Sequence, residues 1–278
     1  MRLRLREQSL ELSRGPLIMG ILNITPDSFS DGGLYLEPSR ALEHAYRMLQ
    51  EGADIIDVGG ESTRPGAEPV PPEEELRRVI PVIRTLARNL PVPISIDTYK
   101  ASVAERALAE GAQIVNDISG LRFDPRMASV AARHKAAVVI MHIKGTPRDM
   151  QKEPSYQDLM KEIKDYLAQG IRLALQAGLA EEAIAVDPGI GFGKRPEHNL
   201  QILKHLQELK ELGRPILVGA SRKSFIAHVL EGLPPQERLE GTLAAQAIAV
   251  LKGAHILRVH DVKASKRAAL LAWAIREA

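Results

Sequence analysis

The 278-residue sequence contains no cysteine, and only 4% of its residues are aromatic. The missing cysteine excludes disulfides, thiolate metal sites and cysteine nucleophiles, and it fits a reducing compartment, so we expect a cytoplasmic protein. Few aromatic side chains argue against the base-stacking surfaces that bind single-stranded nucleic acids. The 37 Lys and Arg residues nearly balance 35 Asp and Glu residues, which argues against nucleic acid or an anionic membrane as the main partner.

Long hydrophobic runs are also missing. No segment approaches the ~20 apolar residues that cross a bilayer, and the first residues lack the continuous apolar stretch of a secretory signal. These first residues alternate Arg with Leu, which fits either a basic arm for nucleic acid or a strand. The period of two favours a strand with Leu3 and Leu5 facing inward and the arginines in water. We therefore expect neither a membrane nor a nucleic-acid partner.

Short apolar runs, most of them rich in β-branched residues, recur along the chain and alternate with segments of helical spacing. They span 17–22, 54–58, 94–97, 113–117, 137–142, 183–187, 215–219 and 255–260. Runs that are apolar throughout are typical of strands buried on both faces of a parallel sheet. Eight such strands alternating with helices predict an α/β protein, a (β/α)8 TIM barrel, in which residues 1–278 form a single domain.

Two further expectations concern the architecture. Residues 1–14 would form a strand pair that closes the bottom of the barrel. A doubly wound parallel sheet is the alternative to a barrel, but no G-x-G-x-x-G motif follows the first run.

Nearly every apolar run finishes on a hydrogen-bonding or charged side chain. The residues at these positions are Asn23, Asp57, Asp97, Asn116, Asp117, His142, Asp187, the turn 221–224, Arg258 and His260. One such carboxylate could simply cap the next helix, but capping hardly explains the whole set. Because the C-terminal ends of barrel strands meet at one mouth, we expect a ligand site there.

Part of this set suits a flat heterocycle. Asp97, Asn116, Asp187 and Lys223 offer acceptors and donors for an amidine-like ring edge. A carboxylate such as that of Asp187 can accept two parallel N–H bonds, and the Lys223 ammonium can donate to a ring carbonyl or nitrogen.

The remaining residues suit an anion. Arg258, His260 and Arg64 supply positive charge close to where barrels often bind phosphate, and Asn23 offers a hard oxygen suited to Mg²⁺ that is also held by substrate phosphates. Ion pairing within the barrel rim is the alternative for Arg258 and Lys223. The part played by His142 stays open between contact with the ligand and packing at the rim.

Two loops rich in Gly, Ser, Thr and Pro, residues 25–33 and 59–66, follow the first two runs. Their composition favours mobile lids that lend backbone N–H groups and Arg64 to an anion, with plain surface turns as the alternative. The sequence has no H-x-x-x-H pair, which argues against a zinc hydrolase, and Ser221 lacks an evident catalytic triad.

In their order along the chain, these motifs resemble the dihydropteroate synthases, folate-pathway enzymes inhibited by sulfonamides. The resemblance runs from about Gly20 to the end of the chain. It rests on the segments 19–33, 54–66, 95–98, 115–117, 187–189, 191–194, 221–225 and 258–261.

The resemblance implies a transferase that joins 6-hydroxymethyl-7,8-dihydropterin diphosphate to 4-aminobenzoate, giving 7,8-dihydropteroate and diphosphate. It also implies Mg²⁺ as cofactor, a homodimer formed through helices late in the barrel, and Mg-assisted, SN1-like loss of diphosphate. The implied catalytic residues are Asp97, Lys223, Arg258, His260, Asp31 and Arg64. The implied substrate-binding residues are Thr63, Pro65, Asp97, Asn116, Asp187, Phe192, Gly219, Lys223, Ser224, Arg258 and His260, with Asn23 at the metal.

Two other functions stay open at this point. One is a pterin-binding barrel that transfers a methyl group from methyltetrahydrofolate to a corrinoid protein, and the other is a pterin-binding barrel without catalysis. The first has no use for a diphosphate site, and the second predicts loss of Asn23, Arg258 or the loop residues, all of which are present.

Overall fold

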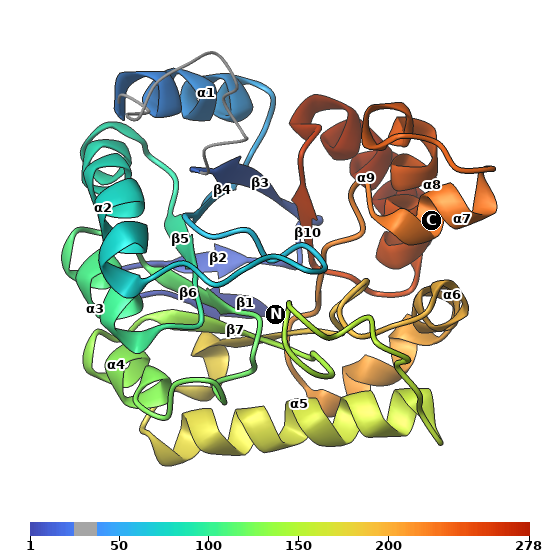
Figure 1. Cartoon of the computed structure of the whole chain (residues 1–278). Helices are drawn as coiled ribbons and strands as arrows, with labels where there is room; N and C mark the ends of the chain where they lie inside the picture. Colours follow the sequence, from blue (N-terminus) through green and yellow to red (C-terminus); the bar gives the residue numbers. More distant parts are fainter. Residues whose placement is uncertain (25–37) are drawn as a thin grey trace.

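A ring of parallel strands surrounded by helices forms the centre of the computed structural model, which describes residues 1–24 and 38–278 (Figure 1). Its strands are β3 (Leu17–Asn23), β4 (Ile55–Gly59), β5 (Ile94–Asp97), β6 (Ile114–Asp117), β7 (Ala137–Met141), β8 (Ile184–Asp187), β9 (Leu217–Val218) and β10 (Ile256–Val259). They pair in the order β8-β7-β6-β5-β4-β3-β10-β9, and a parallel bridge between Val186 and Ile216 joins the two ends. The predicted (β/α)8 barrel is confirmed.

Helices follow the strands in alternation and cover the outside of the ring (Figure 1). They are α1 (Pro38–Gln50), α2 (Pro72–Asn89), α3 (Ala101–Ala109), α4 (Met127–Arg133), α5 (Leu159–Gln176), α6 (Pro196–His205), α7 (Ser224–Val229), α8 (Leu239–Leu251) and α9 (Val262–Glu277). Short 3-10 turns lie at η2 (Glu181–Ala183), η3 (Leu206–Leu212) and η4 (Pro235–Glu237). No helix among the described residues is long and apolar enough to cross a membrane.

The helix α2 illustrates why these segments are helical. It starts with Pro72, whose fixed φ suits a first turn, and continues with three acidic residues that interact favourably with the helix dipole. Val79, Ile83 and Leu86 recur at three- and four-residue spacing and are buried against the strands. The strands themselves need apolar residues on both faces, because one face contacts the helices and the other fills the barrel.

The amino-terminal end of the barrel is closed by an antiparallel strand pair, β1 (Arg2–Arg4) and β2 (Ser9–Glu11), as predicted. Leu3, Leu5 and Leu12 are at most 2% exposed, whereas the flanking Arg2 and Arg4 are exposed. The three leucines form one apolar cluster with the residues that fill the lower barrel, namely Met19, Ile55, Ile114, Ala137, Val139, Ala185, Leu217 and Ile256. This apolar floor leaves the opposite, carboxyl end of the strands as the place for a site.

We predict that Leu3→Ala lowers the free energy of unfolding by about 2–5 kcal/mol, because it leaves a cavity in the floor that its neighbours only partly fill. Leu173→Ala on α5 is the matched control, since that side chain is 40% exposed. Chemical denaturation of both variants checks the prediction. Equal losses in the two variants would show that the strand pair does not form part of the core.

Candidate active site

At the carboxyl end of the barrel, Arg258 of β10 reaches two carboxylates on other strands. Its Nε donates to Asp57 Oδ2 of β4 at 2.6 Å, and its Nη2 donates to Asp97 Oδ2 of β5 at 2.7 Å. Asn116 of β6 donates through Nδ2 to the same Asp57 oxygen at 3.2 Å. The structure thus shows the ion pairing that the sequence left open for Arg258, and it shows that Asp57 is its partner together with Asp97.

Each of the two carboxylates keeps one oxygen unused. Within the described residues, Asp57 Oδ1 and Asp97 Oδ1 are buried and have no hydrogen-bond partner. Burial raises the pKa of Asp97 to about 7; the nearby Asp57 carboxylate acts in the same direction, and Arg258 opposes it. A buried acceptor without a donor is unfavourable, so these oxygens are suited to accept N–H groups from a ligand.

A third carboxylate, that of Asp187, and the ammonium of Lys223 lie beside this group. Asp187 ends β8 and accepts the Gly189 N–H at 2.7 Å, and its pKa is raised by burial while Lys223 opposes the shift. The Lys223 ammonium donates to the carbonyl of Ile190 and lies 4.5 Å from the centre of the Phe192 ring. Burial lowers the pKa of Lys223 to about 8. Within the described residues Lys223 forms no ion pair, unlike Arg258.

Gly219 lies between the side chains of Arg258 and Lys223, where its missing side chain leaves space. A Cβ at this position would lie 3.8 Å from Arg258 Cβ and 4.0 Å from Lys223 Nζ. Of the four residues expected to face a heterocycle, Asp97, Asn116 and Asp187 lie at the ends of β5, β6 and β8, and Lys223 lies just before α7. All four gather around Arg258 at one end of the barrel.

His260, which follows β10, is held by Ser221. The Ser221 hydroxyl oxygen accepts the backbone N–H of His260 at 3.2 Å and lies 3.0 Å from its Nδ1. If the hydroxyl donates its one proton to Nδ1, the ring proton lies on Nε2, and this is the tautomer that we predict. Although His260 is exposed at the mouth, desolvation by its neighbours, followed by the charges of Arg258 and Arg222, lowers its pKa to about 4. His260 is thus neutral near pH 7 beside the arginine.

This Ser–His contact does not create a hydrolase triad. The Asp261 carboxylate accepts hydrogen bonds from Arg222 Nε at 2.9 Å and Nη2 at 2.5 Å, so it orients the arginine and not the imidazole. The sequence showed no evident triad for Ser221, and the structure agrees.

The donor set around Asn23 bears on the implied Mg²⁺. Asn23 ends β3, and its Oδ1 lies 3.6 Å from the point that a Cβ on Gly59 would occupy; Asp97 Oδ2 lies equally far from that point. In the described ranges 1–24 and 38–278, no group of three or more His, Cys, Asp or Glu side chains could hold a metal ion. Such a sparse oxygen set fits Mg²⁺ held chiefly by substrate phosphates and water, and does not fit a protein cage.

The other predicted site residues lie on the surrounding connections. Thr63, Arg64 and Pro65 lie on the β4–α2 loop, which crosses the opening of the ring (Figure 1) and is joined to the β7–α5 loop by the Gly66 N–H and Pro147 O at 3.0 Å. Arg64 is close enough to contribute to the low pKa of His260. Among the described residues, the Thr63 side chain makes no hydrogen bond to the carboxylates of Asp57, Asp97 or Asp187. Asp31 and the loop 25–33 lie outside the described residues.

Phe192 is fixed by side chains that bind the backbone on either side of it. Gln151 Nε2 donates to Gly191 O at 2.7 Å, Tyr156 Oη donates to Gly193 O at 2.6 Å, and Lys194 Nζ donates to Phe192 O at 2.9 Å. Ser224, at the start of α7, lines a neighbouring depression of ≈ 370 Å³ together with Lys194. This segment therefore gives Phe192 a defined position.

Sequence reasoning missed one buried pair. Lys194 and His142 are 2% and 3% exposed, and Lys194 Nζ lies 2.9 Å from His142 Nδ1. Burial lowers the pKa of both groups. His142 therefore supports the lysine that binds the Phe192 carbonyl. Because the two residues are 52 positions apart, no local pattern could have indicated their contact.

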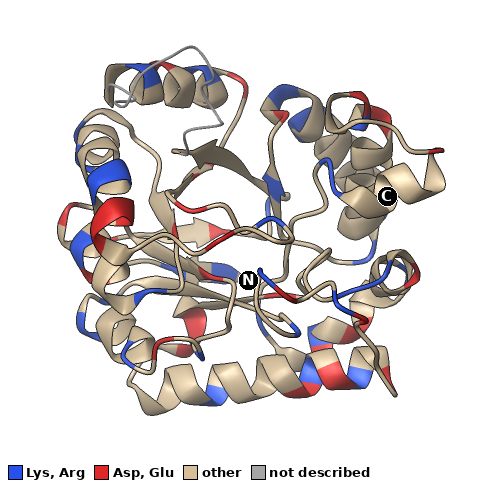
Figure 2. Cartoon of the chain, viewed as in Figure 1, with Lys and Arg blue, Asp and Glu red and all other residues tan. Residues whose placement is uncertain are grey.

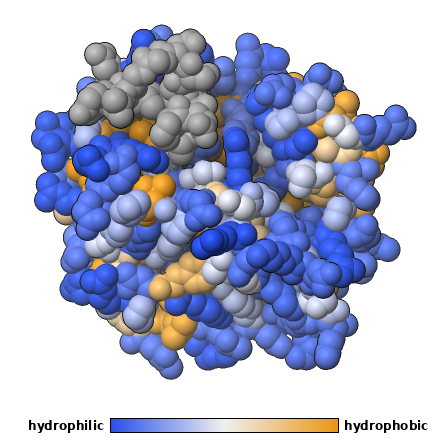
Figure 3. All heavy atoms as spheres, viewed as in Figure 1, coloured by the Kyte–Doolittle hydropathy of each residue, from blue (hydrophilic) through white to orange (hydrophobic). Residues whose placement is uncertain are grey.

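Both signs of charge are distributed over the face that contains the mouth (Figure 2), and most of this face is hydrophilic (Figure 3). The near-zero net charge of the sequence is therefore an average over basic and acidic residues that alternate along the ribbons of this face.

Comparisons with known proteins agree with this geometry. The model of the pterin binding enzyme family matches residues 19–260, which places the barrel and its mouth in that class. The dihydropteroate synthase of Synechocystis is 52% identical over 247 residues, covering 89% of this chain and 86% of the relative. The crystal structure of Yersinia pestis dihydropteroate synthase with a sulfonamide drug complex has a TM-score of 0.94 and 46% identity, with 100% of each chain covered.

A third relative is the Xanthomonas albilineans dihydropteroate synthase with 4-aminobenzoic acid. It has a TM-score of 0.92 and 43% identity, and the match covers 100% of this chain and 98% of that one. This chain belongs to the dihydropteroate synthases, the pterin-binding transferases of folate biosynthesis. The resemblance noted in the sequence is confirmed.

We predict that His260 stays neutral, with its proton on Nε2, down to about pH 4. A histidine pKa that is lower in the folded than in the unfolded state, where it is about 6.5, makes folding less favourable as the pH falls from about 6.5 through about 4. Nitrogen-15 NMR of the imidazole reports both the pKa and the tautomer. Ser221→Ala should leave a mixture of tautomers, with His228 as an exposed reference; an unchanged Nε2–H signal would contradict the assigned role of Ser221.

Proposed function

We propose that the barrel mouth joins 6-hydroxymethyl-7,8-dihydropterin diphosphate to 4-aminobenzoate, with 7,8-dihydropteroate and diphosphate as products. The observation that carries this proposal is the buried Asp57–Arg258–Asp97 group, whose free carboxylate oxygens lie on the same mouth as Lys223 and neutral His260. Acceptors for a heterocycle and donors for an anion are thereby placed side by side. The complex of the Xanthomonas relative with 4-aminobenzoic acid supports the second substrate.

The pterin ring would bind through its amidine-like edge. The free Asp97 oxygen and the Asp187 carboxylate accept ring N–H groups, and the Asn116 amide lies between their strands. Lys223 donates to the ring carbonyl or nitrogen, in exchange for its contact with the Ile190 carbonyl. Of these groups, the Asp97 oxygen gains a hydrogen-bond partner that it lacks within the described residues.

The diphosphate would bind on the side of Arg258, His260 and Arg64. The Nε2–H of His260 donates to a phosphate oxygen, and Arg258 supplies a charge that its two carboxylates keep fixed in place. Asn23 would hold Mg²⁺ together with the diphosphate oxygens, and the bound ion would neutralise part of the leaving group's charge.

The aromatic amine would enter between the β4–α2 loop and the β8–α6 connection. Thr63 and Pro65 border it on one side, and Phe192 and Ser224 on the other, where the fixed backbone around Phe192 provides a rigid wall. Closure of the β4–α2 loop that carries Arg64 would exclude water, which competes with the amine for the reactive carbon.

The reaction needs two bond changes. The bond between the exocyclic methylene carbon and the diphosphate oxygen breaks first, and its electron pair leaves with the diphosphate. The resulting positive charge spreads into the electron-rich dihydropterin, where the Asp97 carboxylate stabilises it. The amine lone pair then forms the C–N bond, and the extra ammonium proton passes to water. No covalent enzyme intermediate is required, which fits a site built from fixed charges.

The remaining proposals concern the whole molecule. We propose a single domain that dimerises through its late helices, where Leu270, Leu271 and Ile275 of α9 are 47%, 65% and 61% exposed. Figure 3 shows apolar surface at the edge of the viewed face near α7 to α9. A cytoplasmic location stays a prediction.

The direct test is synthesis of product from defined components. The protein, Mg²⁺, the pterin diphosphate and 4-aminobenzoate are incubated together, and we predict that mass spectrometry detects dihydropteroate. Absence of product combined with tight binding of methyltetrahydrofolate would instead support the methyltransferase. Pterin binding without turnover of either kind would support a non-catalytic barrel.

A second prediction concerns Asp97. Asp97→Asn should lower kcat by about 10²–10³-fold, because the amide lacks the charge that faces the cation. In the unsubstituted protein kcat/KM should fall as the pH drops through about 7, where Asp97 takes up a proton. This limb should disappear in the variant. Asp165→Asn on α5 is the control, and an unchanged kcat for Asp97→Asn with both substrates saturating would show that the cation-stabilising role is wrong.

A further inference from the structure

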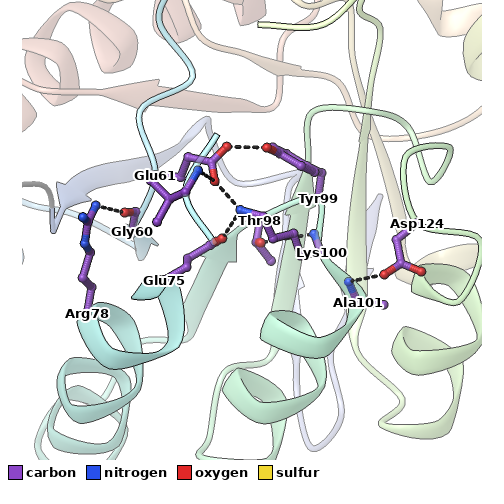
Figure 4. Close-up of polar contacts among 10 residues, drawn as sticks. Gly60, Glu61, Glu75, Arg78, Thr98, Tyr99, Lys100, Ala101 and Asp124 are labelled. Atoms are coloured by element: carbon purple, nitrogen blue, oxygen red, sulfur yellow. Dashed lines mark hydrogen bonds and ion pairs between the residues drawn. The ribbon is translucent and has the colours of Figure 1, made fainter. Parts of the chain in front are cut away.

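The β4–α2 loop is closed on itself by one buried carboxylate, that of Glu61. Glu61 lies two residues after β4 and is 9% exposed, and its Oε2 accepts the Val70 N–H at 3.0 Å from the far end of the loop. Arg78 of α2 donates to Gly60 O at 2.9 Å, which fixes the loop's first residue (Figure 4). The two ends of the segment 62–69 are thereby held close together, and its first end is fixed to α2.

The same carboxylate is bound by two residues that follow β5. The Tyr99 hydroxyl donates to Glu61 Oε1, and the Lys100 ammonium donates to Glu61 Oε2 (Figure 4). Lys100 also donates to Glu75 Oε2 of α2 at 2.5 Å. One ammonium thus joins the loop, the helix after it and the neighbouring strand end.

Two buried carboxylates share this single lysine. Glu75 is fully buried, and its Oε1 has no hydrogen-bond partner within the described residues. Burial raises the pKa of Glu75, and Lys100 opposes the shift. Loss of the lysine would leave two carboxylates facing each other, and the carboxylate on the loop can move away more easily than the one on the helix.

The position of Lys100 is itself fixed by the barrel. Lys100 precedes the first turn of α3, where Asp124 accepts the Ala101 N–H at 3.0 Å (Figure 4), and it lies three residues after Asp97. The short segment from Asp97 to Lys100 therefore contacts Arg258 at one end and the loop carboxylate at the other.

We propose that Glu61, Tyr99 and Lys100 are positioning residues that set the β4–α2 loop relative to Asp97, so that Thr63 and Pro65 border the aromatic amine. This inference rests on the proposed function, because it assigns the loop to the amine. Within the described residues, the side chains of Glu61, Tyr99 and Lys100 make no hydrogen bond to the residues proposed to bind the pterin ring, so we expect the network to act on the substrate mainly through the loop.

The test compares Glu61→Gln with a matched control, Glu110→Gln. Glu110 also binds a cation through two bonds, to Arg84 at 2.7 and 2.8 Å, but lies at the far end of α3 from the mouth. We expect Glu61→Gln to raise the KM for 4-aminobenzoate about tenfold, while the Kd for pterin diphosphate measured without the amine stays within about twofold. Hydrogen exchange in residues 62–70 should become faster in this variant only.

Two further substitutions, Lys100→Met and Tyr99→Phe, should change the KM for 4-aminobenzoate by factors that differ from that of Glu61→Gln. Lys100→Met should raise the KM for the amine more than Glu61→Gln does, since it leaves both carboxylates unpaired. If Lys100→Met fails to fold, Tyr99→Phe removes one hydrogen bond to Glu61 and should raise the same KM by a smaller factor. An unchanged KM in Glu61→Gln and Tyr99→Phe, or an equal loss of pterin affinity, would overturn the inference. Failure of the unsubstituted protein to bind pterin diphosphate would instead contradict the proposed function.

Discussion

The guanidinium of Arg258, held between Asp57 and Asp97, is the interaction on which the rest of the mouth depends. It forms only if the ends of β10, β4 and β5 meet in register, because the two contacts are 2.6 and 2.7 Å long. Burial alone would lower the pKa of Arg258, but the two carboxylates more than offset this and raise it. Removing one partner of such a buried pair typically costs about 3–5 kcal/mol, so the group constrains the fold and the site together.

Arg258 adds to the pKa shifts of its neighbours, which desolvation causes first. Its charge helps to keep His260 neutral, and it contributes to the low pKa of Lys223. The carboxylates in turn keep a free oxygen each for a ligand. The barrel thus holds charges at fixed places, as the proposed reaction, in which a cation develops and an anion leaves, would require. The apolar floor around Leu3 serves the opposite purpose, since it closes the other end of the barrel with aliphatic side chains.

Much of this arrangement could be predicted from the sequence, for identifiable reasons. Continuous apolar runs located the strands to within a residue or two at most ends, and their polar last residues indicated the mouth, since in a barrel both properties are local. Pairings between distant residues could not be obtained this way. Asp57 was visible as a strand end, but its contact with Arg258, 201 positions away, depends on ring closure. The contact between Lys194 and His142 could not be predicted for the same reason. In the sequence, Glu61 cannot be distinguished from the other polar residues of its loop.

In the proposed mechanism, the carbon–oxygen bond breaks before the amine attacks, and the fixed charges stabilise the cation and the diphosphate that result. Pterin diphosphate labelled with oxygen-18 at the bridging position tests it most directly, if it is incubated with the protein and Mg²⁺ without 4-aminobenzoate and then recovered. We predict that the label moves into non-bridging positions of the same phosphate, because the diphosphate departs and returns within the closed site. Retention of all label at the bridge, by protein that binds the substrate and forms product when the amine is added, would contradict it.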